Sequence, residues 1–476
     1  MKREINISNI GAGSLYTPDF ALMLIENRDK LNIKEWRMMD IDPERLHAVA
    51  NFSQRILDEA GMGIQIKATT DLTESVRDAD YVFTTIRVGG ANARILDETI
   101  PIKYGLIGQE TTAPGGLAMG LRNIPVIVDI ANKVAQYAHP NAWLINLSNP
   151  SGMLTEAVYR FAKGKAIGLC NWPRSFWTRM MEAYGVERND VFLELVGLNH
   201  LFWARVFING RDVNYEASEK FKQVFAMKYG DDLVNNKFTM PPDVSDMVTD
   251  WPLIVQYCRY YYLTDEMIKE QDKPFDDKSK MMLDRMRGEL PEEILNRFDF
   301  SRLKTRADFV KDVDDVATEL YEEYNKDGMR LVQGTRGGEG YGAAGLDIVL
   351  AMENNLNEVQ GIDYPNLGSI PGLPSEVVVE HSCLINAAGV YPLSMPALKP
   401  HMHAWVNAAK QYEILACEAA MEGNYRKALE ALMANPLIHD FNKAKDCLNE
   451  LLVAHKEFLP NFSEAIKKIE KGERPY

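Results

Sequence analysis

The chain has 476 residues and a net charge of −15 at pH 7, with 46% hydrophobic and 25% charged residues. This is the composition of a globular protein, and the length exceeds what one hydrophobic core usually supports, so we expect two joined domains. The negative charge, without any basic block, argues against nucleic acid and anionic membranes as partners.

The cysteines and the first residues predict a cytoplasmic protein. No apolar run reaches the roughly 20 residues that cross a bilayer, and the chain enters a strand at once, without the regions of a secretory signal. The five cysteines are odd in number and scattered, with no C-x-x-C pair. This pattern favours free thiols in a reducing compartment over a disulfide framework.

The first 170 residues alternate short β-rich runs with helical stretches. Helices are predicted from Pro18, from Pro43, after Gly116 and from Ser151, and strands at residues 4–10, 36–39, 64–68, 81–85, 142–147 and 165–169. Such alternation builds a parallel sheet with helices on both faces. We therefore predict an α/β fold that begins with a Rossmann-like, doubly wound parallel sheet.

The pattern changes after Cys170. A helix is predicted at residues 174–184, followed by two strands around the turn Asn209-Gly210, because Asn-Gly tolerates the positive φ angles of a tight turn. Residues 405–452 show helical spacing with a break at Gly423-Asn424, and the charged residues 272–297 suit a loop or a solvated helix. The second half is predicted to be a mainly helical α+β domain.

Glycines close the first strand. Gly11, Gly13 and Ser14 lie between that strand and the helix from Pro18, where glycines let the backbone approach a pyrophosphate at the helix N-terminus. Tyr16 replaces the third glycine of the G-x-G-x-x-G pattern, so a plain structural turn is an alternative when the motif is taken alone.

Asp40 strengthens the case for a dinucleotide. It ends the second strand, at the distance expected for a carboxylate that binds the ribose hydroxyls of adenosine. An acidic residue there favours NAD over NADP, because it would repel a 2′-phosphate. Asp42 could share this role, although a helix cap before Pro43 fits it better.

Eight motifs follow one another in the order of a known family. They occupy residues 11–18, 86–90, 93–98, 108–111, 148–150, 170–173, 197–200 and 257–261. With these motifs the chain resembles glycoside hydrolase family 4, the NAD- and metal-dependent glycosidases. The resemblance covers roughly residues 1 to 262. Asn171, in Cys-Asn-x-Pro, makes the chain most similar to the 6-phospho-β-glucosidases, whereas members that act on phosphorylated α-glucosides tend to carry Asp there.

The resemblance implies hydrolysis of 6-phospho-β-glucosides by a redox route. NAD⁺ takes the C3 hydride, a base takes the C2 proton, the aglycone is eliminated, water adds, and the hydride is returned. The C2 hydrogen becomes acidic only when C3 is a ketone, which is why hydride transfer comes first. No net NADH is released.

The resemblance assigns a divalent metal, usually Mn²⁺, to Cys170 and His200. A Lewis acid there suits polarisation of a C3 carbonyl. A soft thiolate would by itself favour zinc or iron. Alone, a buried cysteine or a histidine at a strand end is more often structural, so the assignment depends on the pair.

Tyr257 matches the tyrosine that removes the proton in the family. A free phenol with a pKa of about 10 is a poor base at neutral pH, so a neighbouring cation must favour the phenolate. The alternative is an aromatic core cluster, since Tyr257, Tyr260 and Tyr261 have helical spacing. That alternative suits Tyr260 and Tyr261 better.

The remaining predicted site residues bind or orient the sugar. Asn171 cannot donate a proton and is predicted to hydrogen-bond sugar hydroxyls. Asn149 lies at the carboxyl end of a strand, and Arg94 suits an anionic or hydroxyl-rich ligand; a plain turn and a surface arginine are the respective alternatives. Glu110 is predicted to be catalytic by orienting water or a hydroxyl, with helix capping as its alternative.

The residue for the 6-phosphate departs from the family pattern. Relatives specific for phosphosugars carry Arg in Thr-Arg-Ala, about twenty residues after the tyrosine, whereas this chain has Lys278 in Asp-Lys-Ser-Lys. Lysine can hold a phosphate as a point charge but lacks the bidentate fork of arginine. A non-phosphorylated glycoside and a 6-phospho-β-galactoside therefore stay open as substrates.

Two other functions remain as alternatives. A 2-hydroxyacid dehydrogenase would place its histidine in Gly-x-His-Gly and would need no thiolate, but here Leu201 follows His200. A non-catalytic, NAD-responsive protein would be expected to lose Cys170, His200 or Tyr257.

We assign residues 1–196 to NAD binding, and residues 197–476 to substrate and metal binding and to formation of a homodimer or homotetramer.

Overall fold

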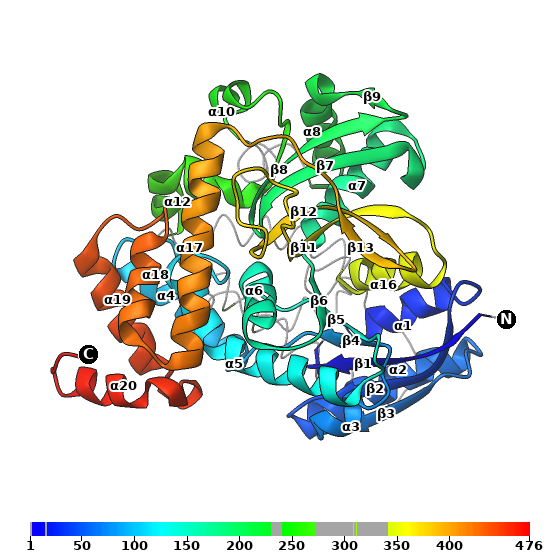
Figure 1. Cartoon of the computed structure of the whole chain (residues 1–476), viewed down its shortest axis with the longest axis horizontal. Helices are drawn as coiled ribbons and strands as arrows, with labels where there is room; N and C mark the ends of the chain where they lie inside the picture. The colour runs from blue at the N-terminus through cyan, green and yellow to red at the C-terminus, as the bar shows by residue number, and fades with distance from the viewer. Residues whose placement is uncertain (1, 15–16, 230–239, 272–307, 309–310, 312–340) are drawn as a thin grey trace.

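The computed structural model describes residues 2–14, 17–229, 240–271, 308, 311 and 341–476. Its strands are β1 (Glu4–Ile10), β2 (Asn32–Met39), β3 (Gln65–Thr69), β4 (Tyr81–Thr84), β5 (Trp143–Asn146), β6 (Lys165–Gly168), β7 (Val191–Leu198), β8 (Leu201–Ile208), β9 (Arg211–Asp212), β10 (Leu253–Ile254), β11 (Glu358–Pro365), β12 (Val378–Asn386) and β13 (Gly389–Pro392). In the described residues these strands form one sheet, in the order β10-β8-β7-β12-β11-β6-β5-β4-β1-β2-β3, with β13 beside β12 and β9 beside β8 (Figure 1).

The helices are α1 (Thr17–Glu26), α2 (Pro43–Glu59), α3 (Leu72–Val76), α4 (Gly90–Lys103), α5 (Ala113–Tyr137), α6 (Ser151–Phe161), α7 (Asn171–Tyr184), α8 (Asn214–Tyr229), α10 (Pro242–Met247), α11 (Arg259–Tyr262), α12 (Thr264–Gln271), α16 (Tyr341–Glu353), α17 (Pro400–Glu422), α18 (Tyr425–Ala434), α19 (Phe441–Ala454) and α20 (Ser463–Glu470). Short 3₁₀ turns are η1 (Arg188–Asp190), η3 (Gln256–Cys258), η5 (Lys456–Phe458) and η6 (Pro460–Phe462). In the described ranges, no helix has the length and apolar character needed to span a membrane.

Strands β1 to β6 form the parallel half of the sheet, and this confirms the predicted Rossmann-like fold. Their order is β3-β2-β1-β4-β5-β6, and every neighbouring pair is parallel. That order is typical of dinucleotide-binding sheets. All six predicted strands are present, within a few residues of the expected bounds.

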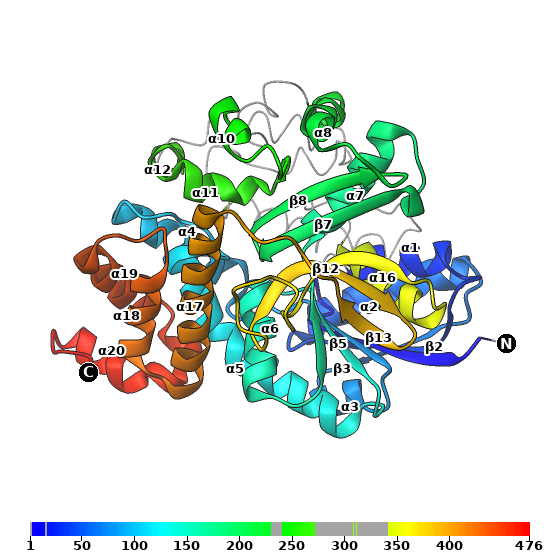
Figure 2. The same ribbon diagram turned by 45° about the horizontal axis from the view of Figure 1, so that its top comes forward.

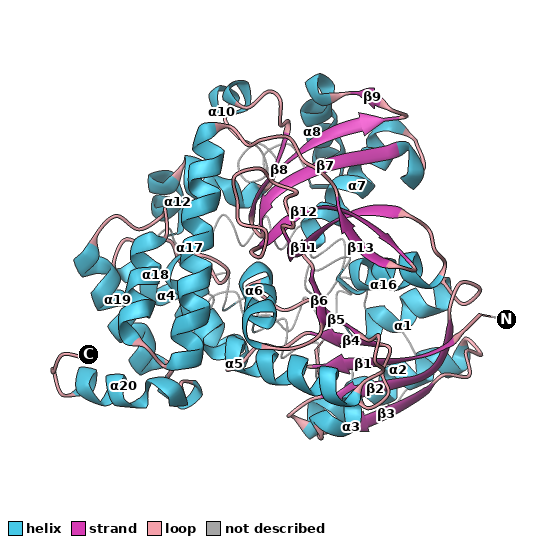
Figure 3. Ribbon diagram, viewed as in Figure 1, coloured by secondary structure: helices cyan, strands magenta, loops and turns pink. Residues whose placement is uncertain are grey.

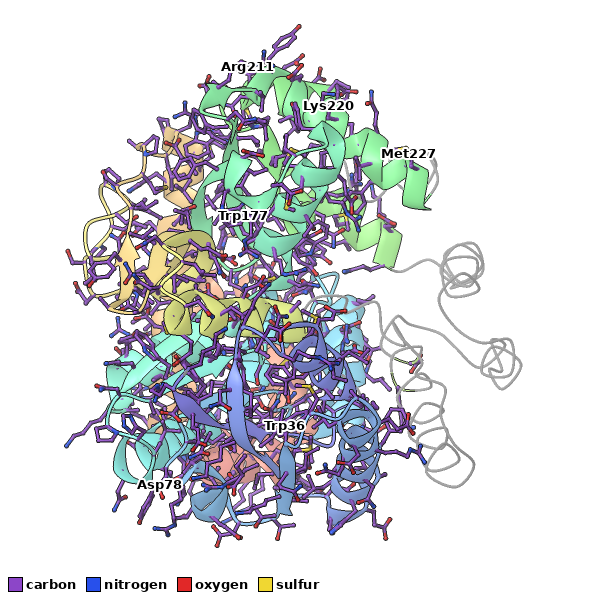
Figure 4. The ribbon with its side chains drawn as sticks, turned by 90° about the vertical axis from the view of Figure 1, so that its right-hand side faces the viewer. Trp36, Asp78, Trp177, Arg211, Lys220 and Met227 are labelled. Carbon is purple, nitrogen blue, oxygen red and sulfur yellow. The ribbon has the colours of Figure 1, made fainter. Side chains whose placement is uncertain are left out.

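Both faces of the parallel half are covered by helices. On one face α1 and α2 pack around Trp36, whose ring lies 5.3 Å from that of Phe20. On the other face α5, α6 and α17 bury a second apolar cluster. Figure 4 shows Trp36 deep in this half of the molecule and Trp177 in the core of the other half. The doubly wound arrangement is therefore confirmed.

The second half of the chain continues the same sheet with antiparallel strands. β11 pairs with β6, and β12, β7 and β8 follow outward (Figure 3). The short β10 pairs with β8 at the edge. The predicted turn Asn209-Gly210 joins β8 to the short β9, as expected. A second hairpin, β7–β8, turns at Asn199-His200 and was not predicted, because this pair lacks the glycine of the usual Asn-Gly turn.

The C-terminal helices form a layer at one side of the sheet. Figure 2 shows α17, α18, α19 and α20 side by side, and α17 packs on α5 and α6. The predicted break at Gly423-Asn424 separates α17 from α18: Gly423 has a φ of +66°, and Asn424 caps α18. Since β7 runs through residue 196 within the common sheet, the division into residues 1–196 and 197–476 stays a prediction.

Candidate active site

The glycine loop after β1 is bent back against the end of β2. The backbone N–H groups of Gly11 and Ala12 donate to the Met39 carbonyl oxygen, at 2.8 and 2.9 Å. Gly11 has a φ of +83°, and a Cβ there would lie 2.6 Å from the Thr85 carbonyl oxygen, so the position requires glycine. The N–H of Ser14 closes the turn on the carbonyl of Gly11 at 3.2 Å.

Asp40 follows β2 and contacts this loop. Its Oδ2 accepts a hydrogen bond from the Gly13 N–H at 2.8 Å, and its Oδ1 accepts from the Asp42 N–H at 3.0 Å. Asp42 caps α2 by accepting from the N–H groups of Glu44 and Arg45, which confirms its predicted role. The Asp40 carboxylate thus lies beside the glycine loop, in the arrangement expected of a dinucleotide site.

A polar network at the carboxyl end of β5 fixes the path of the chain into Asn149. The side chain of Asn146 accepts from the Ser148 N–H at 3.0 Å and donates to the Ser148 carbonyl at 3.1 Å. The Asn123 amide donates to the Asn149 carbonyl at 3.2 Å, and the Asn149-Pro150 peptide bond is cis. Asn149 is half-buried at the edge where open α/β sheets bind ligands.

Arg94 and Glu110 belong to one largely buried ion-pair cluster. Arg94 Nε lies 2.7 Å from Glu98 Oε1 and 3.1 Å from Glu110 Oε2, and Arg87 also pairs with Glu110. The N–H groups of Thr111 and Thr112, just before α5, donate to Gln109 Oε1, and α5 has no side-chain cap. The Glu110 carboxylate is therefore held by arginines rather than used as a helix cap.

Helix α4, which carries Arg94, was not predicted. It begins at Gly90 and contains Pro101 in its last turn, and both residue types oppose helix formation. Tertiary contacts stabilise it instead: Asp97 of α4 forms a bidentate ion pair with Arg122 of α5, and both side chains are fully buried. His455 Nε2 lies 2.9 Å from Asp97 Oδ1.

Cys170 and His200 enter the site from different elements. Cys170 is the N-cap residue of α7 and is 2% exposed, while His200 is 5% exposed in the β7–β8 turn, with a φ of +65°. The thiol contacts Asn171 Oδ1 at 3.7 Å. Burial raises the pKa of the thiol, and the nearby Glu380 adds to this effect.

Tyr257 contacts the predicted metal ligand directly. Its ring stacks on the His200 ring with centroids 3.8 Å apart and planes 15° apart. The Trp172 ring is nearly perpendicular to it, with centroids 6.3 Å apart. Tyr260 and Tyr261 pack against a small core cluster, and Tyr261 also packs, like Tyr257, against the large cluster around β7 and β8. Tyr257 is thus distinguished from its neighbours by the contact with His200.

The donor chemistry fits a divalent cation. A thiolate and an imidazole suit first-row transition ions of borderline softness. Close by, the described residues include buried carboxylate oxygens without a hydrogen-bond partner: Oδ1 of Asp363 and both oxygens of Glu380. Among the residues described, no group of three or more His, Cys, Asp or Glu side chains could hold a metal by itself. Two buried carboxyl groups, those of Asp363 and Glu380, therefore lie near the Cys170 thiol.

Asp363 and Glu380 were missed by the sequence analysis, and so was Asn199 as a contact of Cys170. A signal existed for Glu380, which follows three valines, whereas Asp363 lies in a stretch of mixed polarity that gives none. The structure places Tyr257 against His200, Asn171 against Cys170, Glu110 against Arg94, and Asp40 against Gly13. Lys278 lies outside the described residues. The roles of all these residues stay predictions.

Comparison with known proteins gives full-length matches. The chain is 34% identical to a probable 6-phospho-beta-glucosidase of Bacillus subtilis over 474 residues, which cover 98% of this chain and 100% of the relative. It is 30% identical to a 6-phospho-beta-glucosidase of Escherichia coli, over 99% of this chain and 100% of the relative. A maltose-6'-phosphate glucosidase of Clostridium acetobutylicum is 29% identical, over 97% and 100%.

Solved structures agree with these matches. The 6-phospho-beta glucosidase of Thermotoga maritima, solved with manganese, NAD⁺ and glucose-6-phosphate, superposes with a TM-score of 0.80 at 30% identity, covering 95% of this chain and 99% of the other. The model of the family 4 glycosyl hydrolases matches residues 6–186, and that of the family's C-terminal domain matches residues 195–438. The chain therefore belongs to family 4 of the glycosyl hydrolases.

Proposed function

We propose that this chain hydrolyses 6-phospho-β-glucosides and requires NAD and a divalent metal, with Mn²⁺ as the first choice. The observation that carries the proposal is the stacking of Tyr257 on His200 at 3.8 Å, because it joins the predicted base to the predicted metal ligand. The names of similar proteins support the substrate class, and the Thermotoga maritima structure with manganese, NAD⁺ and glucose-6-phosphate supports the cofactors.

When bound, NAD⁺ supplies a hydride acceptor and Mn²⁺ supplies a Lewis acid. The protein orients the sugar and moves protons. Tyr257 removes the proton at C2, and its phenolate is favoured by positive charge beside His200. Arg94, held by Glu98 and Glu110, orients the sugar hydroxyls, and Glu110 can then order the water that adds later.

The preference for a β-glucoside rests on Asn171. Its amide has no acidic proton for the leaving group, and its Oδ1 is turned towards the Cys170 thiol. Maltose-6'-phosphate glucosidases are also similar to this chain, so overall sequence identity does not decide between an α-glucoside and a β-glucoside as substrate. Asn171 is the residue that favours the β-anomer in this proposal.

The 6-phosphate on the substrate is supported by the names of the relatives and by the predicted phosphate-binding role of Lys278. In the same proposal, residues 1–196 bind NAD, and residues 197–476 complete the substrate and metal site and form a homodimer or homotetramer. The five free, buried cysteines support a cytoplasmic location. Light scattering at several protein concentrations would measure the oligomeric state.

The experiment compares four chromogenic substrates, the 4-nitrophenyl α- and β-glucosides with and without a 6-phosphate, in the presence of NAD⁺ and Mn²⁺ under reducing conditions. We expect turnover of the phosphorylated β-glucoside, and deuterium at C2 of the sugar released in D₂O. Product without deuterium, or full activity after removal of NAD⁺, would refute the route. Stoichiometric NADH from a 2-hydroxyacid would support the dehydrogenase instead.

A further inference from the structure

Four residues form a row across four neighbouring strands beside the site. Gly168 of β6 lies opposite Asp363 of β11, Asp363 lies opposite Glu380 of β12, and Glu380 lies opposite Gly197 of β7. Residues opposite one another in antiparallel pairs project from the same face of the sheet. Two carboxyl groups, both 0% exposed, are therefore adjacent and flanked by glycines.

The glycine beside Asp363 is required by this packing. A Cβ at Gly168 would lie 2.8 Å from the Asp363 Cβ and 2.2 Å from the Thr155 hydroxyl oxygen. The Ser151 hydroxyl donates to Asp363 Oδ2 at 2.6 Å. The carboxyl of Asp363 is thus held in one place between β6 and the first turn of α6.

Other buried carboxyl groups nearby have cationic partners, but this pair has none of its own in the described residues. Glu156 pairs with Lys410 at 3.1 Å and with Arg160 at 2.6 Å, and Glu413 also pairs with Lys410. That cluster contains two acidic and two basic side chains and is balanced. Like charges directly opposite one another are unfavourable, and buried charge without compensation is costly. Burial raises the pKa of both carboxyl groups, so the pair is neutralised by protons unless a cation lies nearby.

Asn199 connects the pair to the predicted metal ligands. Its amide lies close to both the Cys170 thiol and the Glu380 carboxyl, without a hydrogen bond of ordinary geometry to either. The position of a Cβ on Gly152 would be 3.1 Å from the Asn199 Cβ and 3.6 Å from Asp363 Oδ1, so both side chains meet the same turn of α6. Asn199 also directly precedes His200 in the hairpin turn.

We propose that Asp363 and Glu380 are positioning residues that strengthen binding of a divalent cation at Cys170 and His200. They supply the negative charge that balances the cation, and Asn199 lies between the pair and the ligands. They are not ligands themselves. The proposal rests on the proposed function, because it uses the same cation site.

The test measures Mn²⁺ binding to the full-length protein with saturating NAD⁺, from the electron paramagnetic resonance signal of free Mn²⁺. Glu380→Gln and Asp363→Asn are each expected to raise the Mn²⁺ Kd about 10- to 100-fold, the range for residues behind metal ligands. In metal-free protein the same changes are expected to raise the thermal midpoint, since an amide removes one ionisable group from the buried pair. Asp97→Asn is the control, because Asp97 is buried but paired with Arg122.

The control should lower the midpoint without Mn²⁺ and leave the Kd unchanged. A Kd unchanged in both carboxyl variants would overturn the proposal. A lower midpoint in both metal-free variants would also overturn it, because the carboxyls would then stabilise the fold itself. If the unaltered protein does not bind Mn²⁺, the proposed function fails first; if it binds Mn²⁺ and the variants bind equally well, only this inference fails.

Discussion

Replacing Lys410 by methionine should destabilise the protein strongly. Lys410 Nζ lies 3.1 Å from Glu156 Oε2 and also pairs with Glu413, and the side chains of Lys410 and Glu156 are each 1% exposed. Methionine keeps most of the volume but leaves two carboxylates buried without their shared cation. Loss of one partner of a buried ion pair costs about 3–5 kcal/mol. Urea denaturation followed by circular dichroism measures this loss.

The loss should depend on pH in a defined direction. Burial alone would raise the pKa of Glu156, but Lys410 and other donors outweigh burial and lower the pKa below its usual 4.5. A lowered pKa stabilises the folded state above pH 4.5, and this contribution disappears as the pH falls through the folded value. Without Lys410 burial dominates and the folded protein prefers protonated Glu156. The deficit should therefore be larger at pH 8 than at pH 5.

Lys427 provides a matched control. It also lies between two carboxylates, 2.8 Å from Glu418 and 2.6 Å from Glu422, but its side chain is 29% exposed. Exposed pairs contribute little, so Lys427→Met should have a far smaller effect at both pH values. Equal losses for the two lysines, or a Lys410→Met deficit that does not change with pH, would show that burial of the cluster does not govern its energy.

Three further predictions concern the site. Tyr257→Phe should slow exchange of the C2 hydrogen with D₂O by about 100- to 10,000-fold, with NAD binding intact, while Tyr260→Phe should exchange normally; normal exchange in the Tyr257 variant would contradict its role. Cys170→Ser should weaken Mn²⁺ binding by at least about 100-fold and reduce turnover with it. Full activity of the metal-free Cys170→Ser variant would show that Cys170 is not a metal ligand. Asp40→Ser should improve the binding of NADP⁺ relative to NAD⁺ by about tenfold in fluorescence titrations, since a repelling carboxylate is lost. An unchanged ratio of the two affinities would show that Asp40 does not contact the adenosine ribose.

The parallel half of the fold could be predicted because its signals are local. Each strand is a short β-rich run followed by a helix start, and the glycines and Asp40 lie at fixed offsets from those runs. Helix α4 was not predicted, because the prediction used only local signals. Its local signals, Gly90 and Pro101, oppose a helix, and the ion pair between Asp97 and Arg122 that helps to hold it is a tertiary contact.

The antiparallel half was predicted only in outline, because its pairing is non-local. Asp363 lies next to Gly168 across β6 and β11 although almost 200 residues separate them in sequence. No spacing rule indicates such a partner. A carboxylate within an apolar strand opposes the pattern around it, and such conflicts are expected at functional sites. Glu380, which follows three valines, is a conflict of this kind, and the sheet pairs it with Asp363.

The sheet also brings two strands from late in the chain next to the strands that carry the predicted metal ligands. Every motif that carries the family resemblance lies before residue 262, yet β11 and β12 pack between β6, which leads to Cys170, and β7, which leads to His200. Residues 358–386 therefore lie in the sheet between the two strands that lead to the thiol and the imidazole. A change at Asp363 or Glu380 should act on the predicted ligands without altering any recognised motif. Metal affinity measured across variants of these two strands would separate that effect from the chemistry of Cys170 and His200 themselves.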